Sequence, residues 1–133
     1  MNFVLDCSVT MTWFFEDEID PAGRALLDRA TDGEAVVPAI WPGEVANALL
    51  TAERKGRMTR AKVDEDADLV ARLPIGVDRT GAPPAVLIAL ARRYQLSSYD
   101  SSYLELALRL RLPLATRDRR LSAAAGAAKV ELA

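Results

Sequence analysis

NFVLD, residues 2–6, is a short apolar run that ends in a single acid, and it gives the first indication of the fold. A run this short, without polar alternation, predicts a strand buried on both faces. A second run of this kind, AVVP at residues 35–38, follows after one segment of helical length. Because short strands and helical patterns continue to alternate along the chain, the sequence predicts an α/β sandwich with a mainly parallel sheet and helices on both faces.

The predicted helices carry apolar residues at helical spacing, and one of them has Pro42 in its first turn and Gly56 just past its end. Helices are expected over residues 7–15, 21–31, 42–55, 59–73, 84–94, 101–110 and 119–125. Further short strands are expected at residues 75–77, 113–115 and 129–132. A length of 133 residues suits a single domain, residues 1–133.

Histidine is absent from the chain, and Cys7 is the only cysteine. These two facts exclude histidine-dependent triads, HExxH zinc sites, disulfide frameworks and cysteine-rich zinc sites. An enzyme with this composition would work with carboxylates, hydroxyls, lysine or arginine, and a hard metal ion.

The formal net charge of −2 argues at first against a nucleic-acid partner. The charge is unevenly distributed, however, because residues 1–70 hold 14 acids and 7 bases whereas residues 71–133 hold 5 acids and 10 bases. A protein with charges segregated in this way is compatible with RNA binding by its basic half.

Four acids are placed where the chemistry of a parallel sheet is expected. Asp6 follows the first strand, Asp118 follows the strand at residues 113–115, and Glu44 and Asp100 lie at the starts of helices. Ligands of such sheets bind at the carboxyl ends of the strands. The sequence therefore predicts that these four side chains gather at one edge of the sheet.

Each of these acids also has a purely structural interpretation. Asp6, Asp100 and Asp118 each precede a predicted helix and would stabilise it as N-caps, and Glu44 would oppose the positive end of its helix. Capping does not require the acids to converge on one another. Four converging carboxylates would repel, and oxygen ligands without histidine or cysteine suit Mg²⁺ or Mn²⁺.

At these residues the chain resembles the PIN domain family, and within it the VapC-type toxins of bacterial toxin–antitoxin pairs. The matching motifs are VLDCSV with Asp6, WPGEVANAL with Glu44, LSSYDSSYLELA with Asp100 and LPLATRDRRL with Asp118. They run from near the start of the chain to residue 121, so the resemblance covers nearly all of it. It implies a PIN-like α/β/α sandwich.

The resemblance also implies an activity and partners. It implies a metal-dependent endoribonuclease that cleaves structured RNA such as transfer or ribosomal RNA. Asp6, Glu44, Asp100 and Asp118 would bind Mg²⁺ or Mn²⁺, with Ser8 and Thr116 as small polar residues near the metal. Relatives pair as homodimers and are neutralised by a VapB-like antitoxin, and the helix pair of residues 42–73 resembles the clip that grips the antitoxin tail.

Several other residues have two interpretations. Arg117 and Arg120 flank Asp118 and are candidates for contacts to RNA phosphates, although a solvated helix face explains them equally. Trp13, Trp41 and Tyr103 lie beside or on apolar faces and are expected to pack in the core. Tyr99 would either line the groove or contribute a structural hydroxyl.

The apolar start of the chain lacks a basic region and is interrupted by Asp6, which predicts no signal peptide, and no apolar run reaches the length of a membrane span. We therefore expect a cytoplasmic protein. Two other functions are considered. One is a catalytically silent PIN-like binding module. The other is a phosphotransfer domain, which is disfavoured because Asp6-Cys7-Ser8 lacks the second acid of a D-x-D motif.

Overall fold

A four-stranded parallel sheet forms the centre of the computed structural model, which describes all 133 residues. The strands are β1 (Phe3–Leu5), β2 (Ala35–Pro38), β3 (Gly76–Asp78) and β4 (Leu114–Ala115). Their order across the sheet is β3-β2-β1-β4, so the first strand of the chain lies between two neighbours. Val4 of β1 pairs with Val36 on one side and with Leu114 on the other.

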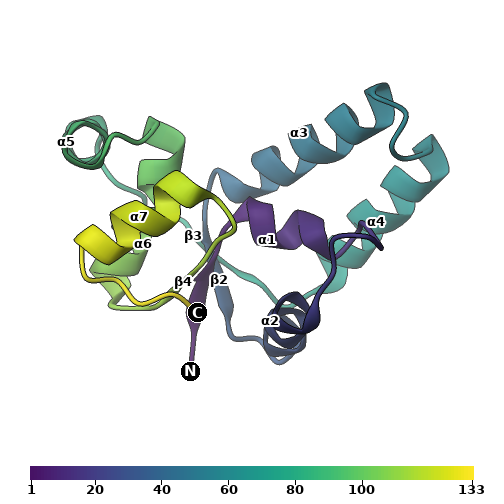
Figure 1. Ribbon diagram of the computed structural model, residues 1–133, viewed down its shortest axis with the longest axis horizontal. Coiled ribbons are helices and arrows are strands. Elements are labelled where there is room, and N and C mark those ends of the chain that lie inside the picture. The colour runs from purple at the N-terminus through teal and green to yellow at the C-terminus, as the bar shows by residue number, and fades with distance from the viewer.

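Seven helices cover this sheet. They are α1 (Cys7–Thr12), α2 (Pro21–Thr31), α3 (Trp41–Arg54), α4 (Arg60–Arg72), α5 (Pro84–Tyr94), α6 (Ser98–Leu110) and α7 (Arg119–Ala127). Figure 1 shows α5, α6 and α7 on one side of the sheet, α1 and α2 on the other, and α3 and α4 together forming an arm that extends outward. The predicted PIN-like α/β/α sandwich is therefore confirmed.

The core explains why the first apolar run has such influence on the fold. Phe3, Val4 and Leu5 have no exposed surface, since strands lie on either side of β1 and helices cover its faces. The long helix α6 packs on β1 and contributes the fully buried Tyr103 and Leu104. Burying a large apolar side chain contributes about 1.5–3 kcal/mol, so a strand without polar residues is stable only at this central place.

Two helix ends differ from the prediction by three residues, and hydrogen bonds explain both. The helix expected over 101–110 begins at Ser98, because the Ser97 hydroxyl accepts a hydrogen bond from the Asp100 backbone N–H at 3.0 Å and caps the helix. The helix expected over 7–15 ends at Thr12. There the N–H groups of Trp13 and Phe14 bond carbonyls three residues back, which tightens the chain into a turn.

The strand expected over 129–132 is also wrong. Only one parallel bridge, between Leu114 and Leu132, joins this segment to the sheet. Helix α7 continues to Ala127, two residues beyond the predicted end, and Lys129 then adopts a left-handed conformation with φ of 62°. An extended strand cannot pass through a left-handed residue, so the pairing is reduced to a bridge.

The two tryptophans pack as predicted. Trp41 is buried and donates its indole N–H to the Thr10 hydroxyl at 3.2 Å, while the half-buried Trp13 donates to the Gly23 carbonyl at 3.0 Å. No helix in the structure combines the length and apolar character that crossing a lipid bilayer requires.

Candidate functional site

The four predicted acids lie at the carboxyl edge of the sheet or at the helix starts that follow it. Asp6 follows β1 directly and precedes α1, and Asp118 precedes α7 after β4. Glu44 and Asp100 lie in the first turns of α3 and α6. The negative charges of these groups affect one another. The charges of Asp100 and Asp118 act to raise the pKa of Asp6, and those of Asp6 and Asp100 act to raise the pKa of Glu44. The structure thus brings the four acids into one neighbourhood.

Asp6 is the most buried of the four, with 6% of its surface exposed. Its Oδ2 atom accepts hydrogen bonds from the Ser8 hydroxyl at 2.6 Å and from the Thr116 hydroxyl at 2.7 Å. Although Asp6 precedes α1, its side chain makes no capping bond to that helix. Ser8 and Thr116, which the sequence places 108 residues apart, therefore act together to fix the orientation of one carboxylate.

Glu44 is held by a residue that the sequence interpretation assigned to the core alone. Tyr103 is fully buried in α6, as predicted, but its hydroxyl donates a hydrogen bond to Glu44 Oε1 across the sheet edge. Burial and this bond to Glu44 raise the pKa of Tyr103 far above its usual range, so the phenol stays protonated and donates. The contact joins positions 59 residues apart, and no local pattern indicates it.

The capping interpretation holds for only one of the three aspartates. Asp118 caps α7 by accepting the Leu121 N–H at 3.0 Å, which leaves its second oxygen available. Asp100 lies inside the first turn of α6, where Ser97 is the cap, so the carboxylate of Asp100 is not used for capping. Thus three of the four acids, all but Asp118, are placed at this edge without a capping role.

Burial raises the pKa of Asp6, Glu44 and Asp100. Hydrogen bonds oppose the rise, at Asp6 from Ser8 and Thr116, while the charges of neighbouring acids add to it. At Asp100 the nearby Arg120 also acts against the rise. In all three groups burial is the largest cause, and the hydrogen bonds and nearby positive charge do not fully offset it.

The donor set fits a hard divalent cation. Every candidate ligand is an oxygen, as Mg²⁺ and Mn²⁺ prefer, and added positive charge would offset both the burial and the repulsion that raise the pKa of Asp6, Glu44 and Asp100. In their present orientations no three acidic side chains are close enough to hold one ion. Binding would require side chains to turn toward a common point, and Glu44 and Asp100 are only half-buried.

The two candidate phosphate-binding arginines differ in their surroundings. Arg117 donates to both carboxylate oxygens of Asp20 at 2.7 and 2.9 Å, so its guanidinium is already paired, while its backbone N–H donates to the Ser8 hydroxyl. Arg120 is exposed and makes no ion pair within 4.0 Å, and its charge lowers the pKa of Asp100. Arg120 is therefore the freer cation beside the acids.

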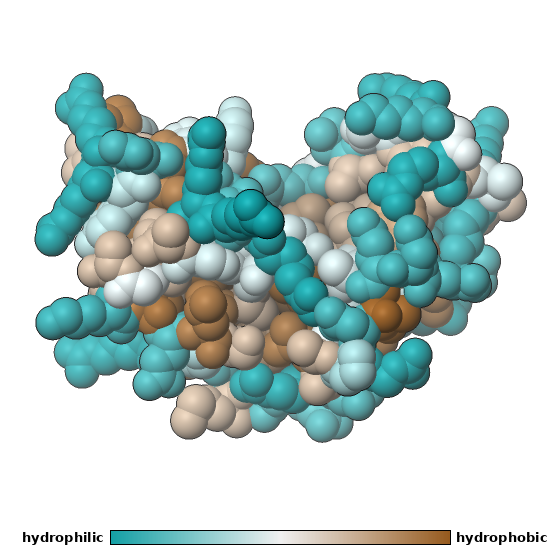
Figure 2. Space-filling model, in the orientation of Figure 1, coloured by the Kyte–Doolittle hydropathy of each residue, from teal (hydrophilic) through white to brown (hydrophobic).

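A groove beside the acids contains cations that the sequence interpretation missed. It has a volume of about 430 Å³, begins at Ser8 and Arg117, and passes between α1 and α3 to Lys55 and Arg57 at the far end of α3, where Glu18 also lines it and pairs with Arg57 at 4.0 Å. Figure 2 shows the surface hollowed between the α6–α7 side and the α3–α4 arm, with hydrophilic side chains on both rims. Lys55 and Arg57 lie in the acidic half of the sequence, and only the fold brings them near Arg117.

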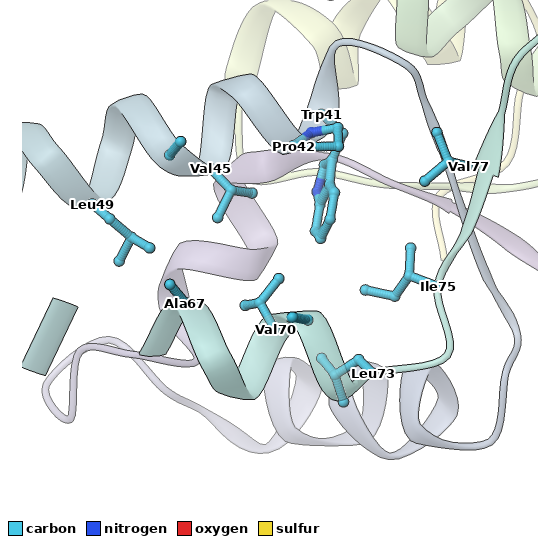
Figure 3. Close-up of a pocket in the computed structure, with 11 residues that line it drawn as sticks. Trp41, Pro42, Val45, Leu49, Ala67, Val70, Leu73, Ile75 and Val77 are labelled. Carbon is cyan, nitrogen blue, oxygen red and sulfur yellow. The ribbon is translucent and has the colours of Figure 1, made fainter. Parts of the chain in front are cut away.

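A second cavity, of about 340 Å³, lies between α3, α4 and β3 and is almost entirely apolar (Figure 3). Trp41, Val45 and Leu49 of α3 face Ala67 and Val70 of α4 across it. These two helices correspond to residues 42–73, the helix pair that resembles the clip for an antitoxin tail. Val45 and Leu49 are buried, as core residues are, while the cavity between the two helices remains open.

With this geometry in place, the chain can be compared with known proteins. The family model of the PIN domain matches residues 3–127. Two solved structures are similar: PAE2754 from Pyrobaculum aerophilum, and a toxin–antitoxin complex from Klebsiella pneumoniae. The first has a TM-score of 0.74 and 23% identity over 93% of this chain and 84% of that one. The second has a TM-score of 0.61 and 17% identity over 88% and 87%.

A parallel sheet with acids gathered at its carboxyl edge places the chain in the class of open α/β proteins, whose ligands bind at that edge. Within that class, this chain belongs to the PIN domain family, because the family model covers nearly its whole length. At identities below 25% the two solved structures show that the fold is shared. No curated protein matches the chain.

Proposed function

We propose that this protein, a single PIN domain over residues 1–133, is a metal-dependent endoribonuclease toxin of the VapC type. Its substrate would be structured RNA of the transfer or ribosomal class, its compartment the cytoplasm, and its inhibitor a cognate VapB-like antitoxin. The observation that carries the proposal is the group of acids at the sheet edge of a PIN fold, where burial, together with the charges of neighbouring acids, raises the pKa of Asp6, Glu44 and Asp100.

Asp6, Glu44, Asp100 and Asp118 would hold Mg²⁺ or Mn²⁺. A bound ion of this kind supplies Lewis acidity toward a phosphodiester and lowers the pKa of water. The chain's part is to position the acids: Ser8 and Thr116 orient Asp6, and Tyr103 orients Glu44. The absence of histidine is no obstacle to this chemistry, because no imidazole base is required.

Basic side chains around the acids would bind the RNA backbone. Arg120 lies beside Asp100, and Lys55 and Arg57 line the groove that starts at Ser8. Contacts of this kind dominate affinity for nucleic acids and weaken as salt increases. Arg117, although predicted for this role, would act mainly through its ion pair with Asp20 and its backbone bond to Ser8.

The antitoxin is proposed to place an apolar segment in the cavity between α3 and α4 (Figure 3). A lining that includes Trp41, Val45 and Val70 favours aliphatic or aromatic side chains of a polypeptide over RNA. The uncompensated acids would in turn attract a basic antitoxin residue. The similarity to a protein solved in a toxin–antitoxin complex supports a partner of this class.

A homodimer is proposed to form through α5. This helix has no buried residue, although its sequence is apolar, and Val86 and Ile88 are 42% and 44% exposed. Leu108 and Leu110 of the neighbouring α6 are also exposed. An exposed apolar helix face of this kind is typical of an interface.

Replacing Ile88 by glutamate is expected to convert the dimer into a monomer, because a buried unpaired charge opposes association. Sedimentation velocity over a range of protein concentrations would measure the change. The matched control is Leu132→Glu, an equally drastic change at an exposed site outside α5. A wild-type protein that stays monomeric, or an Ile88→Glu variant that stays dimeric, would contradict an interface on α5.

The proposed activity is tested by mapping new RNA 5′ ends after brief expression of the protein without an antitoxin. We expect cleavage at one or a few sites in a structured RNA, and none in cells that express the Asp6→Asn variant. Purified protein should reproduce the same sites only with Mg²⁺ or Mn²⁺. If total RNA remains intact in both experiments, the protein is better described as a catalytically silent PIN-like binding module.

A further inference from the structure

A third hollow, with a volume of about 510 Å³, lies beside Glu44. Its walls are Glu44 and Asn47 of α3 and Tyr99 of α6, and Cys7, Ile40, Gly43 and Ala48 complete the lining. Ala48 also lines the groove that contains Lys55 and Arg57, so the two hollows adjoin at this residue of α3. They differ in chemistry, because the hollow at Tyr99 contains no basic side chain.

The Tyr99 ring is 61% exposed and makes no hydrogen bond within the chain, so the fold does not use it. It directly precedes Asp100 in the first turn of α6. A large aromatic surface at this place is available for stacking against a planar ligand, and unpaired bases of RNA stack on aromatic side chains in this way. Its position beside a proposed metal ligand places any such base close to the reacting phosphate.

Asn47 lies three residues after Glu44 on the same face of α3, and it is exposed. Its amide makes no hydrogen bond within the chain and offers both a donor and an acceptor. An aromatic face and a free amide, with Glu44 as the only charged side chain, fit an uncharged planar ring with a polar edge. A phosphate would be repelled by Glu44 and would favour the groove that contains Lys55 and Arg57.

We propose that this hollow binds one unpaired nucleobase of the RNA next to the phosphodiester that is cleaved, with the Tyr99 ring stacked on the base and the Asn47 amide bonded to its edge. The proposal rests on the proposed ribonuclease function and adds to it a source of sequence preference. The sugar-phosphate chain then continues past the acids into the groove lined by Lys55 and Arg57. Asn47 sets which base is preferred, and Tyr99 supplies affinity for any base.

The test measures binding separately from cleavage. Fluorescence anisotropy would follow short single-stranded RNA oligonucleotides that contain a mapped cleavage site, in the Asp6→Asn background. Because stacking on an aromatic side chain is worth enough to change affinity by roughly 5- to 150-fold, Tyr99→Ala should weaken binding within that range and Tyr99→Phe should not. Asn47→Ala should reduce the difference in affinity among oligonucleotides that vary only at the base in the hollow. Leu50→Ala, an exposed α3 residue outside the hollow, is the matched control.

A series of oligonucleotides with one abasic position identifies the base that stacks. One abasic position should weaken binding to the protein with Tyr99 intact but leave binding to Tyr99→Ala unchanged, because the stacking partner is already missing. Equal losses in both proteins, or unaltered binding by Tyr99→Ala, overturn the subsite while leaving the ribonuclease proposal intact if wild-type protein cleaves RNA. A wild-type protein that neither binds nor cleaves RNA overturns both.

Discussion

Replacing Asp6 by asparagine is expected to lower metal-dependent RNA cleavage by about 100-fold or more and to leave the fold intact. The amide has the shape of the carboxylate, and its oxygen can accept the same two hydrogen bonds from Ser8 and Thr116. What is lost is the negative charge that would hold the cation. Since loss of an outer hydrogen-bonding partner alone typically costs 10–100-fold, loss of a ligand should exceed that range.

The measurement is the initial rate of cleavage of the mapped RNA by purified protein with Mg²⁺ and with Mn²⁺, together with the thermal unfolding curve. Asp28→Asn is the control, since Asp28 is exposed on α2, outside the acid group. Asp100→Asn should behave as Asp6→Asn does. Full metal-dependent cleavage by either variant, with a normal unfolding curve, would remove that acid from the proposed active site.

The fold was predictable where the signal is local. The runs at β1 and β2 are apolar without alternation, and the structure places them side by side in the middle of the sheet, where only such strands are stable. The errors occurred where two local signals compete. Both Ser97 and Asp100 are good N-caps, and the serine hydroxyl wins because it reaches the Asp100 N–H, three residues on.

The sequence predicted at which edge of the sheet the site residues lie, but not the contacts that their side chains make. The rule that ligands bind at the carboxyl ends of parallel strands places Asp6 and Asp118 together without any knowledge of side-chain contacts. The interactions that orient the acids were not predictable, because they join distant positions: Tyr103 reaches Glu44, and Thr116 reaches Asp6. Helical periodicity correctly assigned Tyr103 to the core, but periodicity does not predict which group a buried hydroxyl contacts.

Charge patterning along the chain is an incomplete guide to the proposed RNA-binding surface. Counting along the chain favours the basic half, where Arg117 and Arg120 lie. The fold pairs Arg117 with Asp20 and brings Lys55 and Arg57, from the acidic half, into the groove beside it. A net charge over a stretch of sequence does not describe a surface that is assembled from several helices.

Without divalent metal, the free energy of unfolding is expected to fall as the pH rises from about 5 to 7.5. Asp6, Glu44 and Asp100 have raised pKa values in the folded state, so between about pH 4 and those values the folded protein binds more protons than the unfolded one. These carboxyl groups therefore do not destabilise the folded state at low pH, and they destabilise it fully once the pH exceeds their folded pKa values. The chain has no histidine and the thiol pKa of Cys7 is about 12, so neither group masks this trend.

Mg²⁺ or Mn²⁺ should reverse the loss at pH 7.5, because a cation that binds only the folded state stabilises it. The gain is about 2.7 kcal/mol when the free metal reaches 100 times its Kd, which raises the unfolding temperature by several degrees. Thermal unfolding at pH 5 and 7.5, with and without metal, measures both effects. Asp6→Asn should show a smaller pH dependence and a smaller shift with metal, since it removes one of the repelling charges. Acids that carried no metal would instead give the same unfolding temperature with and without the ion, and the proposed ligand set would then be wrong even if the protein cleaved RNA.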